Sequence, residues 1–312
     1  VWTLSGCTKD EMTDTGDPGF DGQTVVFSLV SSDQHISRAT TPGEESLNEN
    51  LVERLDVFFF SQTGECLFYP SESQMEKVDA TIKINVPAAI ADMLYDENIR
   101  LYVIANSNLS RDVLGGKSYR QLIETVHGVS QDYNPYPFKA QTSFLMDGIL
   151  SIGNLTVDRT DLGEVSLSRA ASKINVQIVG ASVDGYTPVE AHVRIDNYLE
   201  LTSLGQEAPL YKAQKSEYHD SEYRPIWIPN TSNEFNTAPF YSYANDWEFG
   251  DSPESYITIR VKWYKDEGGS EPKNYYYRIP FNYIRPSSGD DEIFSLKRNY
   301  IYTLKVNIGA LG

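Results

Sequence analysis

Residues 172–179 read SKINVQIV, and this short stretch decides the fold class. Ile174, Val176 and Ile178 occupy every second position, with polar residues between them. Because successive side chains of a β-strand point to opposite faces, this spacing predicts a strand with one apolar face and one polar face. We expect this strand to be half-buried in a sheet that opens a new domain.

The same period of two recurs along the chain. Other short segments are rich in β-branched and aromatic residues and are bounded by turn residues, which is typical of strands. They are residues 24–30 (TVVFSLV), 54–60 (RLDVFFF), 81–86 (TIKINV), 100–107 (RLYVIANS), 256–264 (YITIRVKWY) and 300–308 (YIYTLKVNI). These strands do not alternate with helices as a parallel βαβ sheet requires. The pattern therefore predicts a mainly β protein built from antiparallel β-sandwiches.

Helical spacing is convincing in only two places. Residues 87–97 (PAAIADMLYDE) follow a proline, and residues 118–129 (SYRQLIETVHGV) place Leu122, Ile123 and Val126 on one face. We expect both segments to form short helices that decorate the first domain.

The length and the composition indicate a globular protein with two domains. At about 150 residues per domain, 312 residues predict two of them, and 40% hydrophobic residues suffice for two cores. We divide the chain into a tether (1–23), an N-terminal sandwich (24–170) and a C-terminal sandwich (171–312), with the boundary in the segment GEVSLSRAAS (163–172).

The charge of the chain excludes some partners. Its formal net charge is −18, which disfavours binding to nucleic acid or to an anionic membrane surface. No run approaches the roughly 18 consecutive apolar residues of a membrane-spanning helix. Membrane attachment would therefore have to be covalent.

The N-terminal segment offers such an attachment at Cys7. Residues 4–7 read LSGC, which fits the small-residue end of a secretory signal and resembles a bacterial lipobox, where the cysteine is lipidated with acyl chains such as palmitate. Two or more chains give stable anchoring, since each buried methylene contributes about 0.8 kcal/mol. Residues 8–11 (TKDE) resemble the tract that directs Bacteroidetes lipoproteins to the cell surface, and the polar residues that follow have the composition of a tether.

Cys7 and Cys66 are the only cysteines, and they could form one disulfide. If Cys7 is lipidated, Cys66 is instead an unpaired thiol, which we expect to pack as a small hydrophobic side chain in a strand.

The sequence shows no convincing catalytic or metal site. The four histidines lie in no HExxH or Cys/His metal spacing. His219 and Asp220 could form a general-base pair, but neighbouring residues of a strand face opposite sides. Asp290 and Asp291 could mimic a glycosidase pair, but they lie in a segment that is typical of a surface turn. We predict no enzyme activity, no metal and no cofactor.

Tyrosines are concentrated in the second half, where 13 of the 21 lie beyond residue 200. One interpretation is a sugar-stacking surface, with Trp227 and Trp247 as the stacking rings of a glycan platform in residues 211–249. The other, which we favour, is that tyrosine suits the wet face of exposed strands and long loops.

Together, several segments resemble the fimbrillin family, the major and minor structural subunits of Bacteroidia-type (type V) pili. The resemblance spans nearly the whole chain and depends on the order of its segments. They are LSGC (4–7), NENLVERLDVFFFSQTGECLFY (48–69), IRLYVIANSN (99–108), FLMDG (144–148), LSRAASKINVQI (167–178) and KRNYIYTLKVNI (297–308). The resemblance implies two tandem transthyretin-like β-sandwich domains.

The resemblance also implies an assembly mechanism. Such subunits reach the outer-membrane surface as lipoproteins, and an Arg-specific protease then removes the N-terminal segment with its first strand. Here that strand would present Val25, Phe27 and Leu29 to the core. Arg38 is the expected cleavage position because it lies in a polar loop that a protease could enter. Arg54 competes with it, but Arg54 begins a predicted strand.

A strand from the next subunit would fill the resulting groove, and the resemblance implies that the C-terminus supplies it. Its apolar face consists of Tyr302, Leu304, Val306 and Ile308. Burying four such side chains contributes roughly 6 to 12 kcal/mol before ordering costs. The same segment could simply be the last strand of its own domain, and both states can occur in turn.

The implied partners are other fimbrial subunits and surface receptors on host or bacterial cells. The implied location is the outer-membrane surface and then the extracellular fimbrium, with a role in adhesion. The alternative is a surface lipoprotein that does not polymerise, either a fimbrial anchor that keeps its lipid or a glycan-binding protein.

Overall fold

The computed structural model describes residues 22–31, 47, 49–95, 97–141, 143–205, 212–229, 238–247, 252–269, 271–281 and 295–312. The predictions for Cys7, Arg38 and Asp290–Asp291 lie outside these residues.

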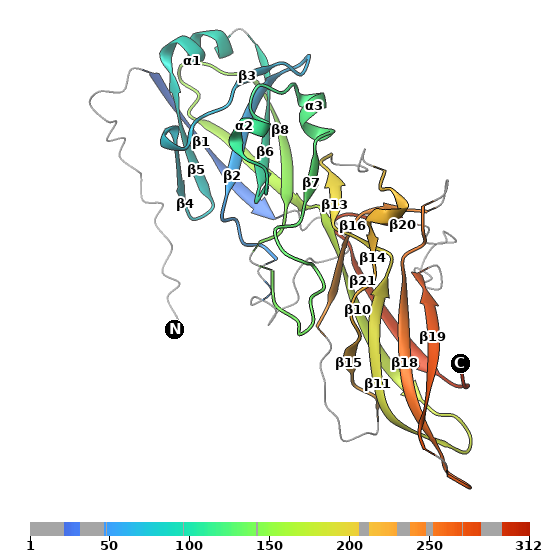
Figure 1. The fold of residues 1–312 in the computed structure, drawn as a ribbon. Helices are drawn as coiled ribbons and strands as arrows, with labels where there is room; N and C mark the ends of the chain where they lie inside the picture. The colour runs from blue at the N-terminus through green and yellow to red at the C-terminus, as the bar shows by residue number, and fades with distance from the viewer. Residues whose placement is uncertain are drawn as a thin grey trace, which may run out of the picture.

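The first half of the chain forms one 8-stranded sheet, with the strand order β3-β2-β6-β8-β9-β1-β5-β4 (Figure 1). Its strands are β1 (Gly22–Ser31), β2 (Leu55–Ser61), β3 (Cys66–Phe68), β4 (Met75–Val78), β5 (Thr81–Pro87), β6 (Asn98–Ala105), β8 (Met146–Asn154) and β9 (Asp161–Arg169). β9 pairs with β8 through its last two residues and with β1 along the rest of its length, so it joins two layers. Apolar residues of β1 and β5 share a core with those of β2 and β6, which makes this half a sandwich.

The second half begins at β10 (Ala171–Ala181), which a single residue separates from the end of β9. A 3-stranded sheet has the order β16-β10-β21, and a 4-stranded sheet has the order β15-β11-β18-β19. Their bounds are β11 (Tyr186–Asp196), β15 (Arg224–Ile226), β16 (Phe240–Tyr243), β18 (Tyr256–Lys265), β19 (Lys273–Pro280) and β21 (Ile301–Ile308). Short two-stranded pairs complete it: β12 (Tyr198–Leu199) with β14 (Tyr218–His219), β13 (Leu201–Ser203) with β7 (Val126–Gly128), and β17 (Asn245–Asp246) with β20 (Ser295–Leu296).

The predicted strand of residues 172–179 lies in β10, and its apolar face is buried as expected. Ile174, Val176 and Ile178 pack in one core with Val193 of β11 and Ile259 of β18. The two sheets therefore enclose a shared core. The mainly β sandwich fold with short helices is confirmed.

Most strand pairs are antiparallel, but two are parallel. β1 runs parallel to β9, and β10 runs parallel to β21. Alternation of side chains is the same in both kinds of pair, so the sequence pattern does not reveal strand direction.

The helices are short. They are α1 (Ala88–Tyr95), α2 (Arg111–Leu114), α3 (Tyr119–Ile123) and the 3₁₀ turns η2 (Glu72–Gln74) and η3 (Lys215–Glu217). α3 begins with a capping box, in which Ser118 Oγ accepts from the Gln121 N–H and Gln121 Oε1 accepts from the Ser118 N–H. Within the described ranges, none of the helices is long and apolar enough to cross a membrane.

The expected helix over residues 118–129 is wrong in its second half. α3 ends at Ile123, and Val126 begins β7, where its side chain is 37% exposed. β7 pairs with β13 of the second half, and these tertiary hydrogen bonds override the helical spacing. β-branched residues such as Val126 also favour the extended backbone.

Candidate functional site

The first strand, β1, occupies the interior of the sheet. It pairs antiparallel with β5 and parallel with β9, so both of its edges are hydrogen-bonded. Val25 and Phe27 are 0% and 1% exposed, and Leu29 packs partly buried against the same core. The three side chains predicted to face the core therefore do so.

The amide of Gln23 holds the beginning of β1 in place. Its Nε2 donates to the carbonyl oxygens of Thr156, Val157 and Arg159 at 2.8, 3.2 and 2.9 Å. Removal of β1 would leave the facing edges of β5 and β9 without a backbone partner, because β1 is the strand that pairs with both of these edges. The space left would be an apolar groove one strand wide.

The last strand, β21, has the opposite placement. It lies at the edge of its sheet and pairs with β10 alone among the described strands. Tyr302, Leu304, Val306 and Ile308 are buried, while the residues between them are exposed. The strand therefore has one apolar face and one backbone edge that pairs with no other described strand.

The end of the chain after β21 contacts the opposite sheet. The Tyr277 hydroxyl accepts from Trp263 Nε1 at 3.0 Å and donates to the Ala310 carbonyl at 2.9 Å. Leu311 packs partly buried against the core of the second half. The terminal residues are thus tied to β19 in this state.

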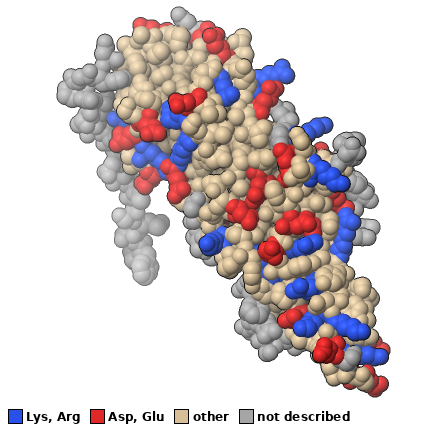
Figure 2. Space-filling model, in the orientation of Figure 1, with Lys and Arg blue, Asp and Glu red and all other residues tan. Residues whose placement is uncertain are grey.

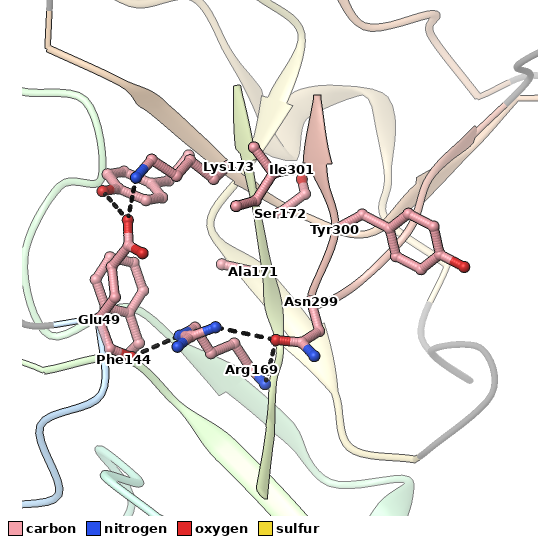
Figure 3. Close-up of a pocket in the computed structure, with 10 residues that line it drawn as sticks. Glu49, Phe144, Arg169, Ala171, Ser172, Lys173, Asn299, Tyr300 and Ile301 are labelled. Carbon is pink, nitrogen blue, oxygen red and sulfur yellow. Dashed lines mark hydrogen bonds and ion pairs between the residues drawn. The ribbon is translucent and has the colours of Figure 1, made fainter. Parts of the chain in front are cut away.

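A buried ion pair joins the two halves of the chain beside β10 (Figure 3). Lys173 Nζ lies 2.9 Å from Glu49 Oε1, and the Tyr241 hydroxyl donates to the same carboxylate oxygen at 2.7 Å. Arg169 Nε donates to the Glu49 carbonyl at 2.5 Å, and its Nη1 donates to Asn299 Oδ1 at 3.1 Å. These contacts connect the segment that precedes β2 with the residues that precede β21.

A second buried ion pair fixes the residues just before β21. Arg298 Nη2 contacts Asp147 Oδ1 of β8 and donates to the Ser168 carbonyl at 3.0 Å. The Tyr102 hydroxyl donates to Asp147 Oδ2 at 2.8 Å, and burial, followed by the Asp147 charge, raises the pKa of Tyr102 well above its usual value. Asn299 then turns the chain with a φ of 59°, in the left-handed region. β21 is thus fixed at its first residues and bound along its length by β10.

The other predicted site residues do not form one constellation. Trp227 follows β15 and is 39% exposed, whereas Trp247 packs against Phe281 with the ring centroids 6.4 Å apart. No ring contact between the two tryptophans occurs among the described residues. Asp220 Oδ1 accepts from the Asn197 N–H at 3.0 Å, while the His219 ring lies 5.7 Å from that of Tyr198. The structure therefore does not bring the possible glycan platform or the general-base pair together.

Arg54 and Cys66 lie in the first half. Arg54 Nη2 is 3.1 Å from Asp56 Oδ2, and Arg54 Nη1 donates to the Ser107 carbonyl at 3.1 Å, which ties this arginine to the sheet as expected. Cys66 is partly buried in β3, and burial raises the pKa of its thiol. Within the described ranges, no group of three or more His, Cys, Asp or Glu side chains could hold a metal ion.

Sequence reasoning missed the charged residues of the two buried ion pairs, which are Glu49, Asp147, Lys173 and Arg298. The signal for two of them was a charge beside apolar residues, Asp147 in FLMDG and Lys173 in SKINVQIV. A charge in such a position is buried only if a partner arrives from elsewhere in the fold.

The arrangement of two sandwiches is that of fimbrial and adhesin proteins of known structure. A fimbrilin (FimA) from Porphyromonas gingivalis W83 is 15% identical, with 93% of this chain and 90% of that chain covered and a TM-score of 0.55. A candidate cell adhesion protein from Parabacteroides distasonis is 18% identical (92% and 88% covered, TM-score 0.62). The tip fimbrial protein Mfa3 from P. gingivalis is 15% identical (91% and 95% covered, TM-score 0.51). At these identities the likeness concerns the fold.

The sequence of the first half matches a known family model. Residues 24–155 match the family model of the major fimbrial subunit protein (FimA). This segment is therefore similar to the major fimbrial subunit family, and the predicted resemblance to fimbrillins is confirmed. No curated protein sequence matches the chain.

Proposed function

We propose that this protein is a structural subunit of a fimbrium that assembles by donor-strand exchange. The observation that carries the proposal is the position of β1, which is the most N-terminal described strand and yet lies in the interior of the sheet, between β5 and β9. A strand with this position can be cut from the chain at a single point, and its loss opens a groove that only another strand can fill.

Cleavage after Arg38 would supply that cut. Arg38 lies between β1 and Glu49 in the sequence, so hydrolysis there separates β1 from the rest of the fold. The Glu49–Lys173 ion pair would hold the new N-terminal segment to the second half. The competing Arg54 is bound by Asp56 and by a backbone carbonyl, which limits access of a protease to it.

The C-terminal strand of the next subunit is the proposed donor. β21 presents alternating apolar side chains, as β1 does, and its outer backbone edge pairs with no other described strand. In the groove, main-chain hydrogen bonds would supply affinity and the apolar side chains would set the register. Burial of its four inward side chains contributes roughly 6 to 12 kcal/mol gross, which makes the exchange hard to reverse.

Export as a lipoprotein completes the proposal. Acyl chains on Cys7 would hold the uncleaved subunit on the outer-membrane surface. The cut after Arg38 would release the subunit from this anchor and open the groove in one step. The product is an extracellular fimbrium whose partners are other fimbrial subunits and adhesion receptors, and its role is structural, not catalytic.

The test is digestion of the folded protein with an Arg-specific protease. The matched control is Arg38→Lys, which keeps the charge but removes the cleavage position. We expect a cut after Arg38 in the wild type, followed by fibres in electron micrographs, and neither in the variant. A wild-type protein that is cut and stays monomeric would contradict polymerisation and favour the alternative of a fimbrial anchor.

A further inference from the structure

The outward face of the 4-stranded sheet β15-β11-β18-β19 combines aromatic rings with positive charge. In β18, Tyr256, Thr258, Arg260 and Lys262 alternate with buried residues and point away from the core. Figure 2 shows Lys and Arg side chains, interspersed with Asp and Glu, over the lower part of the molecule, where Figure 1 places β11, β18 and β19.

Arg260 lies at the centre of this face. Across the sheet it is paired with His192 of β11 on one side and with Tyr276 of β19 on the other. Its guanidinium also stacks over the ring of Tyr223, 4.7 Å from the ring centroid, and Arg194 stacks over the same ring at 5.0 Å. We call Arg194, Tyr223, Trp227, Arg260 and Tyr276 the arginine–aromatic face.

Three carboxylates on this side of the sheet already have cationic partners. Arg194 lies 2.5 Å from Asp196, Lys262 lies 3.5 Å from Glu190, and Arg278 lies 2.7 Å from Glu254. Within the described part of the chain, Arg260 contacts the Tyr223 ring but no carboxylate. Its planar fork of N–H donors is therefore available to an external anion.

Exposed rings flank this guanidinium on two sides. Tyr276 is 54% exposed, and Trp227, which continues the outward side of β15, is 39% exposed. From β15 to β19 there are three strand spacings, roughly 14 Å, which is long enough for a short oligosaccharide lying across the sheet. Aromatic faces stack on the apolar faces of sugar rings, while a guanidinium binds a carboxylate or sulfate in bidentate fashion.

The composition of the face argues against a protein as its occupant. The cores of protein–protein interfaces are enriched in Arg and aromatic residues but depleted of Lys and Glu, yet the middle of this sheet carries the Glu190–Lys262 pair. A partner that is polar along its length and carries negative charge fits better. We propose that the arginine–aromatic face binds an acidic oligosaccharide, with Arg260 on its anionic group and Tyr276 and Trp227 beneath its rings.

This proposal does not depend on strand exchange, so the uncleaved protein serves for the test. The probes are oligogalacturonate, which carries carboxylates, a heparin oligosaccharide, which also carries sulfates, and neutral maltoheptaose, each titrated calorimetrically. We expect one or both acidic probes to bind, with an affinity that falls as salt is added, and maltoheptaose not to bind. Arg260→Ala should weaken binding by about tenfold or more, because it removes a charge-assisted contact.

The matched control is Arg120→Ala, which removes one exposed positive charge from α3, far from this sheet in the sequence. It should leave the affinity unchanged, and Tyr276→Ala should lower it. Thermal unfolding of each variant reports whether the fold is intact, and Arg260→Lys, which keeps the charge, should retain part of the affinity. Equal affinity in the Arg260→Ala and Arg120→Ala variants would overturn the proposal. So would self-association of the wild type that Arg260→Ala abolishes, because a second copy would then be the occupant.

Discussion

The Glu49 carboxylate lies 2.9 Å from the Lys173 ammonium, with side-chain exposures of only 1% and 4%. These two residues are far apart in the sequence and belong to the two halves of the molecule. Each compensates the desolvation of the other, and Tyr241 adds a hydrogen bond to the carboxylate. The pair therefore fixes the segment before β2 against the second half.

Removal of one partner should be costly. Lys173→Met leaves the Glu49 carboxylate buried without its cation, and we expect the free energy of unfolding to fall by about 3 to 5 kcal/mol. Urea denaturation measures this loss. The double variant Glu49→Gln/Lys173→Met should lose less than the sum of the two single variants. The control is Lys262→Met, which removes one partner of the exposed Lys262–Glu190 pair and should lower the free energy of unfolding by about 1 kcal/mol or less. Additive losses at Glu49 and Lys173 would contradict the coupling.

His127 should make the protein less stable in acid. Its ring is fully buried, with Nδ1 3.2 Å from Ser107 Oγ, and burial, followed by the Arg54 charge, lowers its pKa to about 4. The unfolded chain binds this proton more readily than the folded chain does. The stability that the neutral His127 ring contributes is therefore present above about pH 6.5 and is lost as the pH falls through 4. It amounts to about 3 kcal/mol.

The measurement is the free energy of unfolding of the wild type and of His127→Gln at pH 6.5 and pH 4. The wild type should lose more stability over this interval than the variant, since other groups titrate equally in both. An identical loss in the two proteins would show that His127 does not carry the effect.

Glu200 should act in the opposite direction. Burial, together with the neighbouring Asp132, raises the pKa of Glu200 to about 7, although its Oε1 accepts from the Tyr133 N–H at 2.8 Å. Folding then favours the protonated carboxyl, so this contribution is present below about pH 4.5 and is lost as the pH rises through 7. The melting temperature of the wild type should fall between pH 4.5 and pH 7.5, and this fall should be smaller in Glu200→Gln. A decline of equal size in both would contradict this assignment.

Gly148 marks a close approach of β8 to β9. A Cβ at this position would lie 2.4 Å from the Ser166 carbonyl oxygen and 2.9 Å from Val165 Cγ1. Gly148→Ala should therefore destabilise the protein by about 1 to 3 kcal/mol, as overpacking does. Gly309→Ala is the matched control, because a Cβ there meets nothing within 4 Å. Chemical denaturation compares the two variants, and equal stability would show that the strands can separate without cost.

Alternation predicted the strands whose one face is apolar, because burial of that face is a local property of the sequence. The residues of β10 and β21 are examples. β11 was missed because Pro188 and several polar residues interrupt its apolar spacing, although its inward residues are buried. The true end of α3 depends on pairing between β7 and β13, which no local pattern contains.

The candidate site was predictable in part for the same reason. Val25 and Phe27 were found by their spacing, and the structure buries them. The interior position of β1 and the edge position of β21 are properties of topology, which the period of two does not specify. The pairing of Glu49 with Lys173 joins residues that only the tertiary fold brings together.

The most direct test of strand exchange uses the cleaved subunit and a peptide of residues 300–312, which contains β21. A control peptide carries Leu304→Ser and Val306→Ser, which remove two inward apolar side chains. Native mass spectrometry follows the fragment that ends at Arg38. The account predicts that the wild-type peptide binds the cleaved subunit and displaces this fragment, while neither peptide binds the uncleaved protein and the control peptide displaces nothing. Retention of the fragment with no bound wild-type peptide would contradict it.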